Sequence, residues 1–272
     1  MRQSGGGYRR WLSSPILSGS AAVHLGAAAA ILADAQVWPW ALGAVAANHG
    51  VLAAAGLWPR SQLLGPNWIR LPAPSGARGE VAITIDDGPD PAVTPRVLAQ
   101  LEEHRVQATF FCVGERVERH AELAREIVRR GHAIENHSQR HRHNFSLLGP
   151  GGMRAEIVRA QDSISRITGS SPRFFRAPAG LRNPFLEPVL ESLQLRLASW
   201  TRRGFDTVRG DADIVYQRLA NPLRGGDILL LHDGNAALTA AGQPVILSVL
   251  PPLLEALRVR GLTPIVLRAA LP

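Results

Sequence analysis

Two adjacent carboxylates stand at the end of a short apolar run near residue 86. Asp86 and Asp87 end the run VAITID, and Gly88-Pro89 follows them as a turn. Two neighbouring carboxylates repel each other unless a cation is near, so one of them suits a metal ion and the other stays free to act as a base. An Asp-rich turn that caps a helix explains the same letters. Taken alone, the pair leaves a metal site and a structural turn equally open.

Two imidazoles follow the third apolar run. His137 and His141 are four residues apart in the segment HSQRH. They lie on one face if this segment turns helical, and neutral imidazole suits zinc and related divalent metals. Solvent-exposed loop histidines are the alternative, and we expect His143 to be one of these. Together with Asp87 the two histidines make three protein ligands, which leaves positions open for water and substrate as in catalytic metal sites.

Further polar residues stand at or just after the ends of other apolar runs, namely Arg176, Asp206 and His232. In a (β/α) barrel the carboxyl ends of the strands build the active site, so this distribution is what a catalytic centre requires. The pair His232-Asp233 by itself is explained at least as well by a structural hydrogen bond. The sequence has no Gly-x-Ser-x-Gly elbow and no phosphate-binding glycine loop, which argues against serine hydrolase and nucleotide-dependent chemistry.

Strand and helix patterns alternate from about residue 80 onward. Short β-rich runs lie at residues 81–86, 108–114, 132–137, 173–178, 195–200, 227–233 and 263–267. Helical spacing separates them at residues 94–104, 115–130, 154–168, 183–192, 212–223 and 245–260. This alternation predicts a parallel sheet, and its repetition favours an α/β fold in the form of a distorted (β/α) barrel of about seven strands.

Two apolar stretches open the chain, at about residues 14–32 and 38–57. Each is close to the ~20 residues that a helix needs to cross a bilayer. The connector between them carries one charge, Asp34, and Trp38 and Trp58 lie where interfacial aromatic belts are expected. We therefore expect a transmembrane helical hairpin that contacts membrane lipid.

Other interpretations of the N-terminus remain open. Arg9 and Arg10 resemble part of a twin-arginine signal, and residues 33–35 a cleavage site. A buried helix pair in a soluble protein is a further possibility. If the hairpin spans a membrane, the arginines before it and Arg60 after it predict a multi-pass protein of a bacterial-type inner membrane with its catalytic domain in the cytoplasm.

The expected domain order is a membrane hairpin at 1–58, a linker rich in proline and glycine at 59–79, and a catalytic domain at 80–272.

The single cysteine, Cys112, is expected to be a buried small side chain rather than a nucleophile. The net charge of +8 comes from arginine alone, since the sequence has no lysine. These arginines alternate with acids along helical stretches, which argues against nucleic acid as a partner.

Four ordered motifs, TIDDGPD, HSQRH, RAPAG and LLLHD, resemble those of the polysaccharide deacetylase family (NodB-like, carbohydrate esterase family 4) over roughly residues 80–268. The resemblance implies a hydrolase that removes the N-acetyl group from an amino sugar with the help of a divalent metal, most often zinc. The metal ligands that it implies are Asp87, His137 and His141. Asp86 would be the general base that activates the attacking water, and Arg176 would orient it.

The same resemblance assigns roles to the remaining candidates. His232 would be the general acid that protonates the leaving amine, and Asp206 would tune its pKa. A backbone N–H near Ala179 would help to stabilise the oxyanion, and Leu230 would line the pocket for the acetyl methyl group. Trp200 would contact the sugar.

This chain also departs from the family pattern after Trp200. Arg203 stands where the family tends to have an acid, Thr207 where it has an indole, and Ala179 where members often carry an aromatic ring. The changes remove sugar-stacking surface, which favours a membrane-associated glycan or glycolipid over a long polymer as the substrate. The alternatives are an outward-facing peptidoglycan or exopolysaccharide deacetylase and a catalytically silent carbohydrate-binding module.

Overall fold

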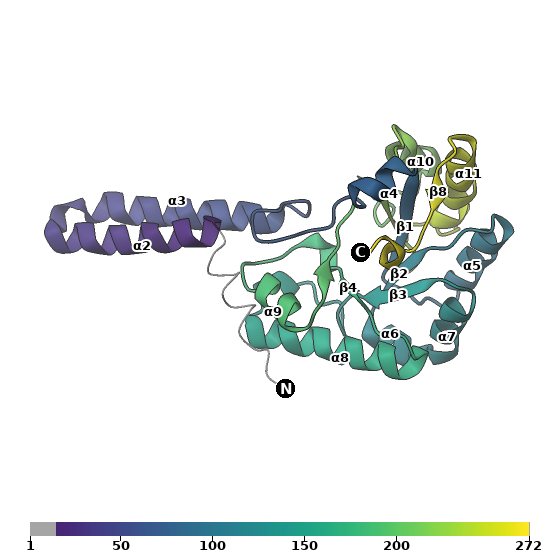
Figure 1. Ribbon diagram of the computed structural model, residues 1–272, viewed down its shortest axis with the longest axis horizontal. Helices are drawn as coiled ribbons and strands as arrows, with labels where there is room; N and C mark the ends of the chain where they lie inside the picture. Colours follow the sequence, from purple (N-terminus) through teal and green to yellow (C-terminus); the bar gives the residue numbers. More distant parts are fainter. Residues whose placement is uncertain (1–14, 272) are drawn as a thin grey trace.

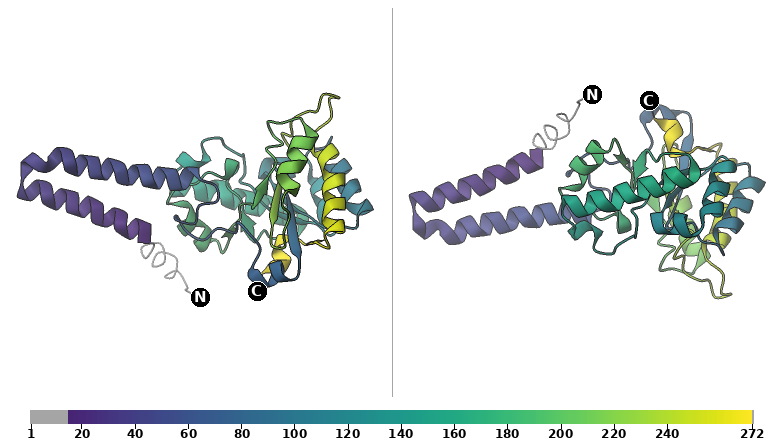
Figure 2. Two further views of the ribbon diagram at one scale, coloured as in Figure 1. Left: turned by 90° about the horizontal axis from the view of Figure 1, so that it is seen from above. Right: turned by 90° about the horizontal axis from the view of Figure 1, so that it is seen from below.

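A long helical hairpin projects from an α/β body in the computed structural model, which describes residues 15–271 (Figure 1). The hairpin consists of α2 (Pro15–Ala33) and α3 (Trp38–Leu57), joined by the short 3₁₀ turn η1 (Ala35–Val37). It extends away from the body in the views from above and below as well (Figure 2). Arg9 and Arg10 lie outside the described residues.

The outer surface of the hairpin is apolar. No residue of α2 is buried, although its sequence consists mainly of Ala, Leu, Ile, Val and Gly. By length and composition both hairpin helices can cross a membrane, a property that membrane anchors share with signal sequences. The predicted pair of neighbouring apolar helices is thus present, and its insertion into a membrane remains a prediction.

Polar side chains join the two hairpin helices at one level. Nε2 of His24 lies 3.2 Å from Nε2 of His49, and Asn48 donates a hydrogen bond of 2.8 Å to Ser20 Oγ. The ring of His24 also lies with Nδ1 2.7 Å from the Ser20 carbonyl oxygen. These contacts pair the polar groups with one another within an otherwise apolar surface.

The body is built on a curled parallel sheet, which confirms the predicted distorted barrel in the form of a half-barrel. The strand order is β5-β4-β3-β2-β1-β7-β6, and β8 pairs with the start of β1. The strands are β1 (Glu80–Asp86), β2 (Thr109–Cys112), β3 (Ala133–Asn136), β4 (Phe174–Phe175), β5 (Arg196–Leu197), β6 (Arg202–Arg203), β7 (Ile228–His232) and β8 (Thr263–Pro264). The sequence pattern did not predict β6, because two arginines show no apolar alternation; β6 is defined by its pairing with Leu229 and Leu230 of β7.

Both faces of the central strands are covered, which explains why they read as unbroken apolar runs. Val81, Ile83 and Ile85 of β1 belong to the large core cluster that the helices cover. Ala82, which points to the other face, belongs with Leu230 to a second cluster. Cys112 is fully buried at the end of β2, as expected.

Helices surround the sheet, and all but the first of them lie close to where the sequence spacing indicates. They are α4 (Ala73–Ala77), α5 (Thr94–Glu103), α6 (Gly114–Arg119), α7 (Ala121–Arg129), α8 (Pro150–Thr168), α9 (Leu186–Ser192), α10 (Ala212–Ala220) and α11 (Ile246–Val259), with 3₁₀ turns η2 (Phe145–Leu147), η3 (Pro178–Gly180) and η4 (Leu267–Ala270). The expectation of one helix at 115–130 was wrong. His120 leaves the helical region, with φ −124° and ψ 52°, and separates α6 from α7.

The stretch 59–79, expected as a linker, lies against the open side of the half-barrel. Trp68 forms a parallel bridge with Ala198, just after β5, and Arg70 forms an antiparallel bridge with Asp227, just before β7. Leu71, next to Arg70, is buried. The stretch therefore connects the segment after β5 with the segment before β7, and part of it is packed against the body.

The base of the hairpin is fixed to the loops that follow β4 and β5. The backbone N–H of Arg182 donates to the Gly56 carbonyl at 3.1 Å, and Ser199 Oγ donates to the Pro59 carbonyl at 2.7 Å. A Cβ at Gly56 would lie 2.2 Å from the Arg182 carbonyl oxygen, so only glycine permits this approach. The end of α3 is thereby held beside the loop that contains η3.

Candidate active site

A cleft of about 520 Å³ opens where the carboxyl ends of the strands meet. The register of β1 and β7 makes Asp86 and His232 direct partners, so the two residues that end these strands stand side by side. His137 follows β3 and Arg176 follows β4, and the pairing of these strands brings both toward the same opening. The residues predicted from strand ends thus gather at one place, as the geometry of parallel strands requires.

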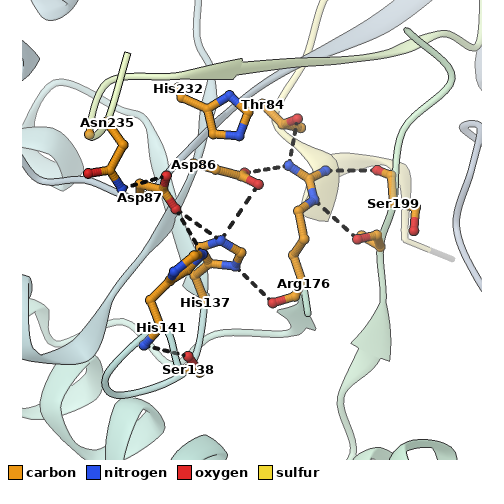
Figure 3. A network of polar contacts seen from close by, with 12 residues as sticks. Thr84, Asp86, Asp87, His137, Ser138, His141, Arg176, Ser199, His232 and Asn235 are labelled. Carbon is orange, nitrogen blue, oxygen red and sulfur yellow. Dashed lines mark hydrogen bonds and ion pairs between the residues drawn. The ribbon is translucent and has the colours of Figure 1, made fainter. Parts of the chain in front are cut away.

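Three potential metal ligands converge in this cleft (Figure 3). The ligand atoms of Asp87, His137 and His141 all lie within 4.8 Å of one another. Asp87 Oδ1 is 3.2 Å from Nε2 of each histidine. Asp87 and His137 are buried and His141 is half-buried, so the group is closed on the protein side and open toward the cleft.

The hydrogen bonding of His137 indicates that this group suits a cation. Its Nδ1 lies 2.8 Å from the Arg176 carbonyl oxygen and therefore donates a proton to it. In the neutral ring Nε2 then directs a lone pair at Asp87 Oδ1, a buried oxygen that has no hydrogen-bond partner in the described part of the chain. Two lone pairs at this separation repel unless a positive ion lies between them, and an N, N, O ligand set fits a divalent metal.

The segment HSQRH is a loop, so the condition that it turns helical is not met. Ser138 and His141 have φ values of 64° and 48°, in the left-handed region. The backbone N–H of His141 donates to Ser138 Oγ at 3.0 Å, which helps to hold the turn. The two imidazoles come together because the loop reverses direction, not because of helical spacing, and His143 packs edge-on against His141 without joining the ligand group.

Charged and buried surroundings control the state of Asp87. Burial alone would raise the pKa of this carboxyl, but the nearby imidazoles of His137, His232 and His141 outweigh burial and hold the pKa far below its usual range. Asn235 Nδ2 donates to Asp87 Oδ2 at 3.0 Å and so turns Oδ1 toward the histidines. Asn235 was missed in the sequence, where its one signal is a polar residue just beyond a strand end.

Asp86 is held by a fully buried arginine. Arg176 donates from Nη1 to Asp86 Oδ1 at 2.5 Å and to Thr84 Oγ1 at 2.9 Å, and from Nη2 to the Ser199 carbonyl at 2.8 Å. Its guanidinium carbon also lies 4.0 Å from the centre of the Phe111 ring. The arrangement balances the charge of Asp86 and fixes its orientation.

His232 is bonded twice to Asp206, a fully buried residue that follows β6. Nδ1 of His232 lies 2.8 Å from Asp206 Oδ1, and its backbone N–H donates to Oδ2 at 2.7 Å. Burial lowers the pKa of His232, but the charge and hydrogen bond of Asp206 outweigh this effect and raise the pKa to about 9. The structural alternative applies to Asp233 instead, which accepts hydrogen bonds from Thr94 Oγ1 and the Gly234 N–H.

The substrate-side candidates line the same cleft. Leu230 and Trp200 are buried members of the second apolar cluster, and Ala179 is exposed on the wall with a φ of 54°. Arg203 also lines the cleft, and its guanidinium carbon lies 5.4 Å from the centre of the Trp200 ring. Leu230 and Trp200 thus line the same cleft as Asp86, His232 and the group Asp87, His137 and His141.

Comparison with known sequences agrees with this geometry. The family profile described as polysaccharide deacetylase matches residues 74–198. A chitooligosaccharide deacetylase of Bradyrhizobium sp. (strain ANU 289) is 36% identical over 161 residues, which cover 59% of this chain and 73% of the relative. A peptidoglycan-N-acetylglucosamine deacetylase of Bacillus cereus is 31% identical over 158 residues, 57% of this chain, and the match spans only 56% of that relative.

A solved structure shows the same relationship in three dimensions. The family 4 acetyl xylan esterase of Clostridium thermocellum, determined with a cobalt ion, superposes with a TM-score of 0.63 at 30% identity and covers 70% of this chain and 89% of the other. The parallel half-barrel, the ordered motifs and these relatives lead to one assignment. The chain belongs to the polysaccharide deacetylase family of hydrolases.

Proposed function

We propose that this protein is a metal-dependent N-deacetylase that removes the acetyl group from an N-acetylglucosamine-type amino sugar on a membrane-associated glycan or glycolipid. The reaction is supported above all by one observation. Asp86 and His232, partners in the register of β1 and β7, flank the cleft that contains the group Asp87, His137 and His141. Relatives named as deacetylases of chitooligosaccharides and of peptidoglycan support the substrate class.

The three converging ligands would hold a divalent cation, and we expect zinc because it accepts imidazole and carboxylate ligands together. When bound, such a cation polarises the amide carbonyl and makes water more acidic. Asp87 would contribute the anionic ligand oxygen, and Asn235 would keep that oxygen turned inward. Three protein ligands leave room for substrate and water on the cleft side.

The acid–base chemistry would be divided between two residues whose environments differ. Asp86 is oriented by its hydrogen bond from Arg176 and is placed to accept the proton of the attacking water. His232 is kept protonated by Asp206 and is placed to donate a proton to the departing amine nitrogen. Leu230 and Trp200 would contact the acetyl methyl group and the sugar, and the backbone N–H of Ala179 would stabilise the oxyanion.

The docking of the hairpin supports a substrate at a membrane surface. Pro59 lies two residues after the end of α3, and a Cβ at Gly180 would lie 2.7 Å from Pro59 and 2.6 Å from Trp200. Gly180 and Trp200 both line the cleft, so its wall packs against the segment that follows the apolar helix α3. A membrane-inserted α3 would therefore hold the cleft close to the lipid head groups.

An outward-facing deacetylase of peptidoglycan or exopolysaccharide is the second candidate, because the same hairpin would tether it. Topology separates the two: a reporter fused after Pro272 should be active in the cytoplasm under the orientation predicted from Arg60 and its N-terminal counterparts, and in the periplasm under the alternative. A silent carbohydrate-binding module is opposed by the presence of every ligand, base and acid candidate in one cleft.

The decisive experiment measures bound metal and acetate release together in the full-length protein purified in detergent. Wild type should bind metal and release acetate from acetylated amino sugars. Asp86→Asn should keep the metal and lose activity by about 10²–10⁴-fold, the range for a general base. His137→Ala should lose both, whereas His143→Ala, a neighbouring histidine outside the ligand group, should keep the metal. Wild type with neither metal nor acetate release would refute the proposal.

A further inference from the structure

Three arginines line the cleft without an ion-pair partner among residues 15–271. Arg116 and Arg119 lie on α6 on one wall, and Arg203 lies on β6. Arg140 also lines the cleft, but its charge is balanced by an ion pair of 2.8 Å with the buried Glu156. The charge of Arg140 is thus balanced within the protein, whereas the charges of the other three arginines are not.

The guanidinium of Arg203 is positioned by two aromatic rings. Its guanidinium carbon lies 5.4 Å from the centre of the Trp200 ring and 4.7 Å from that of Phe205, so aromatic faces define its position. Its Nε atom is buried and has no hydrogen-bond partner within the described chain. An unpaired positive charge that is partly buried is costly, and an anionic substrate group beside the guanidinium would reduce that cost.

Arg116 is connected directly to the surroundings of the metal ligands. Its Nη2 donates to Asn235 Oδ1 at 3.2 Å, and Asn235 donates in turn to Asp87. A Cβ at Gly234 would lie 2.1 Å from Arg116 Nη1, so the arginine packs tightly over the glycine backbone. Arg119 lies one helical turn further along α6 and is exposed.

We infer that the amino sugar substrate carries a phosphate ester, which Arg203 binds while Arg116 and Arg119 supply further positive charge. This inference rests on the proposed function and specifies its substrate. The planar guanidinium presents paired N–H groups that match phosphate oxygens. Several unpaired arginines around one cleft favour a phosphate over a neutral glycan, which offers them no charge to balance.

The test compares a short prenyl ester of N-acetylglucosamine 1-phosphate with the matching neutral prenyl glycoside. Both are assayed for acetate release with the metal-loaded, full-length protein. Both are also titrated calorimetrically against the metal-free protein, where phosphate cannot coordinate a metal. N-acetylmuramic acid serves as a carboxylate probe. The variants are Arg203→Gln and Arg119→Gln, and Arg258→Gln on α11, which is exposed and far along the chain from the cleft residues, is the matched control.

Wild type should prefer the phosphate ester in kcat/KM, and Arg203→Gln should reduce that preference by about 10- to 100-fold, the range for a charged hydrogen bond. Arg119→Gln should reduce it less, and Arg258→Gln should leave it unchanged. Equal turnover of both substrates, with the same ratio in Arg203→Gln, would overturn this inference and leave the deacetylase proposal intact. Tight binding of the ester that Arg203→Gln weakens, with no acetate released, would overturn the proposed reaction alone. Equally tight, Arg203-dependent binding of N-acetylmuramic acid would overturn the choice of phosphate.

Discussion

One pair of neighbouring histidines in the cleft and another in the hairpin differ in the chemistry that their surroundings allow. In the cleft, Nε2 of His137 and of His141 each lie 3.2 Å from Asp87 Oδ1. In the hairpin, the Nε2 atoms of His24 and His49 lie 3.2 Å from each other. A carboxylate adds negative charge and a third ligand atom, so the cleft pair can enclose a cation. Two imidazoles alone can share a proton and join two helices.

The surroundings of the two pairs differ as much as their partners. His137 is 2% exposed and is fixed from behind by the Arg176 carbonyl, whereas His24 and His49 are exposed on apolar helices. Substitution of a buried, fully hydrogen-bonded group is expected to cost much stability, and substitution of an exposed group is expected to cost little. The comparison teaches that residue type indicates a possible metal site, while partners and burial decide whether one exists.

The largest effect on stability should come from the buried support of the cleft. Replacing Arg176 by Met leaves the carboxylate of Asp86 buried without its partner, and should lower the free energy of unfolding by about 3–5 kcal/mol. Denaturant unfolding of the full chain in detergent measures this loss. Arg258→Met, which removes an exposed arginine, should change stability by less than about 0.5 kcal/mol. Similar losses in both variants would contradict the difference between buried and exposed charge.

A pH-dependent effect should follow from the pair of His232 and Asp206. The folded-state pKa of His232, about 9, lies above the ordinary value of 6.5, so its protonation stabilises the fold fully below pH 6.5. That stabilisation should disappear as pH rises through 9, by up to about 3 kcal/mol. Asp206→Asn should flatten this slope in the metal-free protein, as denaturant unfolding at a series of pH values would show. An unchanged slope would mean that another group titrates.

A smaller effect is expected from Asn235, which orients the proposed metal ligand Asp87. Asn235→Ala removes the hydrogen bond to Asp87 Oδ2. Loss of such an outer contact should weaken metal affinity by about 10- to 100-fold, measured by competition with a chelator. Asn144→Ala, at an exposed position before η2, is the control and should bind metal as wild type does. Unaltered affinity in Asn235→Ala would show that the histidines alone position Asp87.

The smallest effect should arise in the hairpin. If the hairpin spans a membrane, the coupling between His24 and His49 should amount to about 0.6 kcal/mol, the average for side-chain hydrogen bonds between membrane helices. A double-mutant cycle with His24→Ala and His49→Ala in bicelles measures it. Neither substitution should change the metal content. If either one depleted the metal, the two histidine pairs could not be as independent as their separation in the fold suggests.

Much of the fold follows from the sequence because hydrophobic periodicity is local information. The apolar runs of β1 and β7 and the spacing of α5 and α8 are visible in short windows, and each element formed close to its expected position. The rule that parallel strands present their carboxyl ends together also brought Asp86, His137 and His232 into one expected site. The roles proposed for these residues remain predictions.

The sequence could not predict features that local apolar periodicity does not encode. β6 exists through its pairing with β7, and the break at His120 separates helices that share one apolar pattern. The loop HSQRH depends on left-handed residues at Ser138 and His141, whose conformation no periodicity encodes. Asn235 could not be recognised because its partner, Asp87, is distant in sequence.

The sequence by itself thus determined an α/β fold, an apolar N-terminal helix pair and the residue types available for hydrolysis, since composition and spacing are properties of the chain. Tertiary structure decided which atoms meet: the lone pairs of Asp87 and His137, the bond of Arg176 to Asp86, and the contact of Pro59 with the cleft wall. Distances between remote side chains depend on strand order and loop conformation, which arise only when the whole core packs.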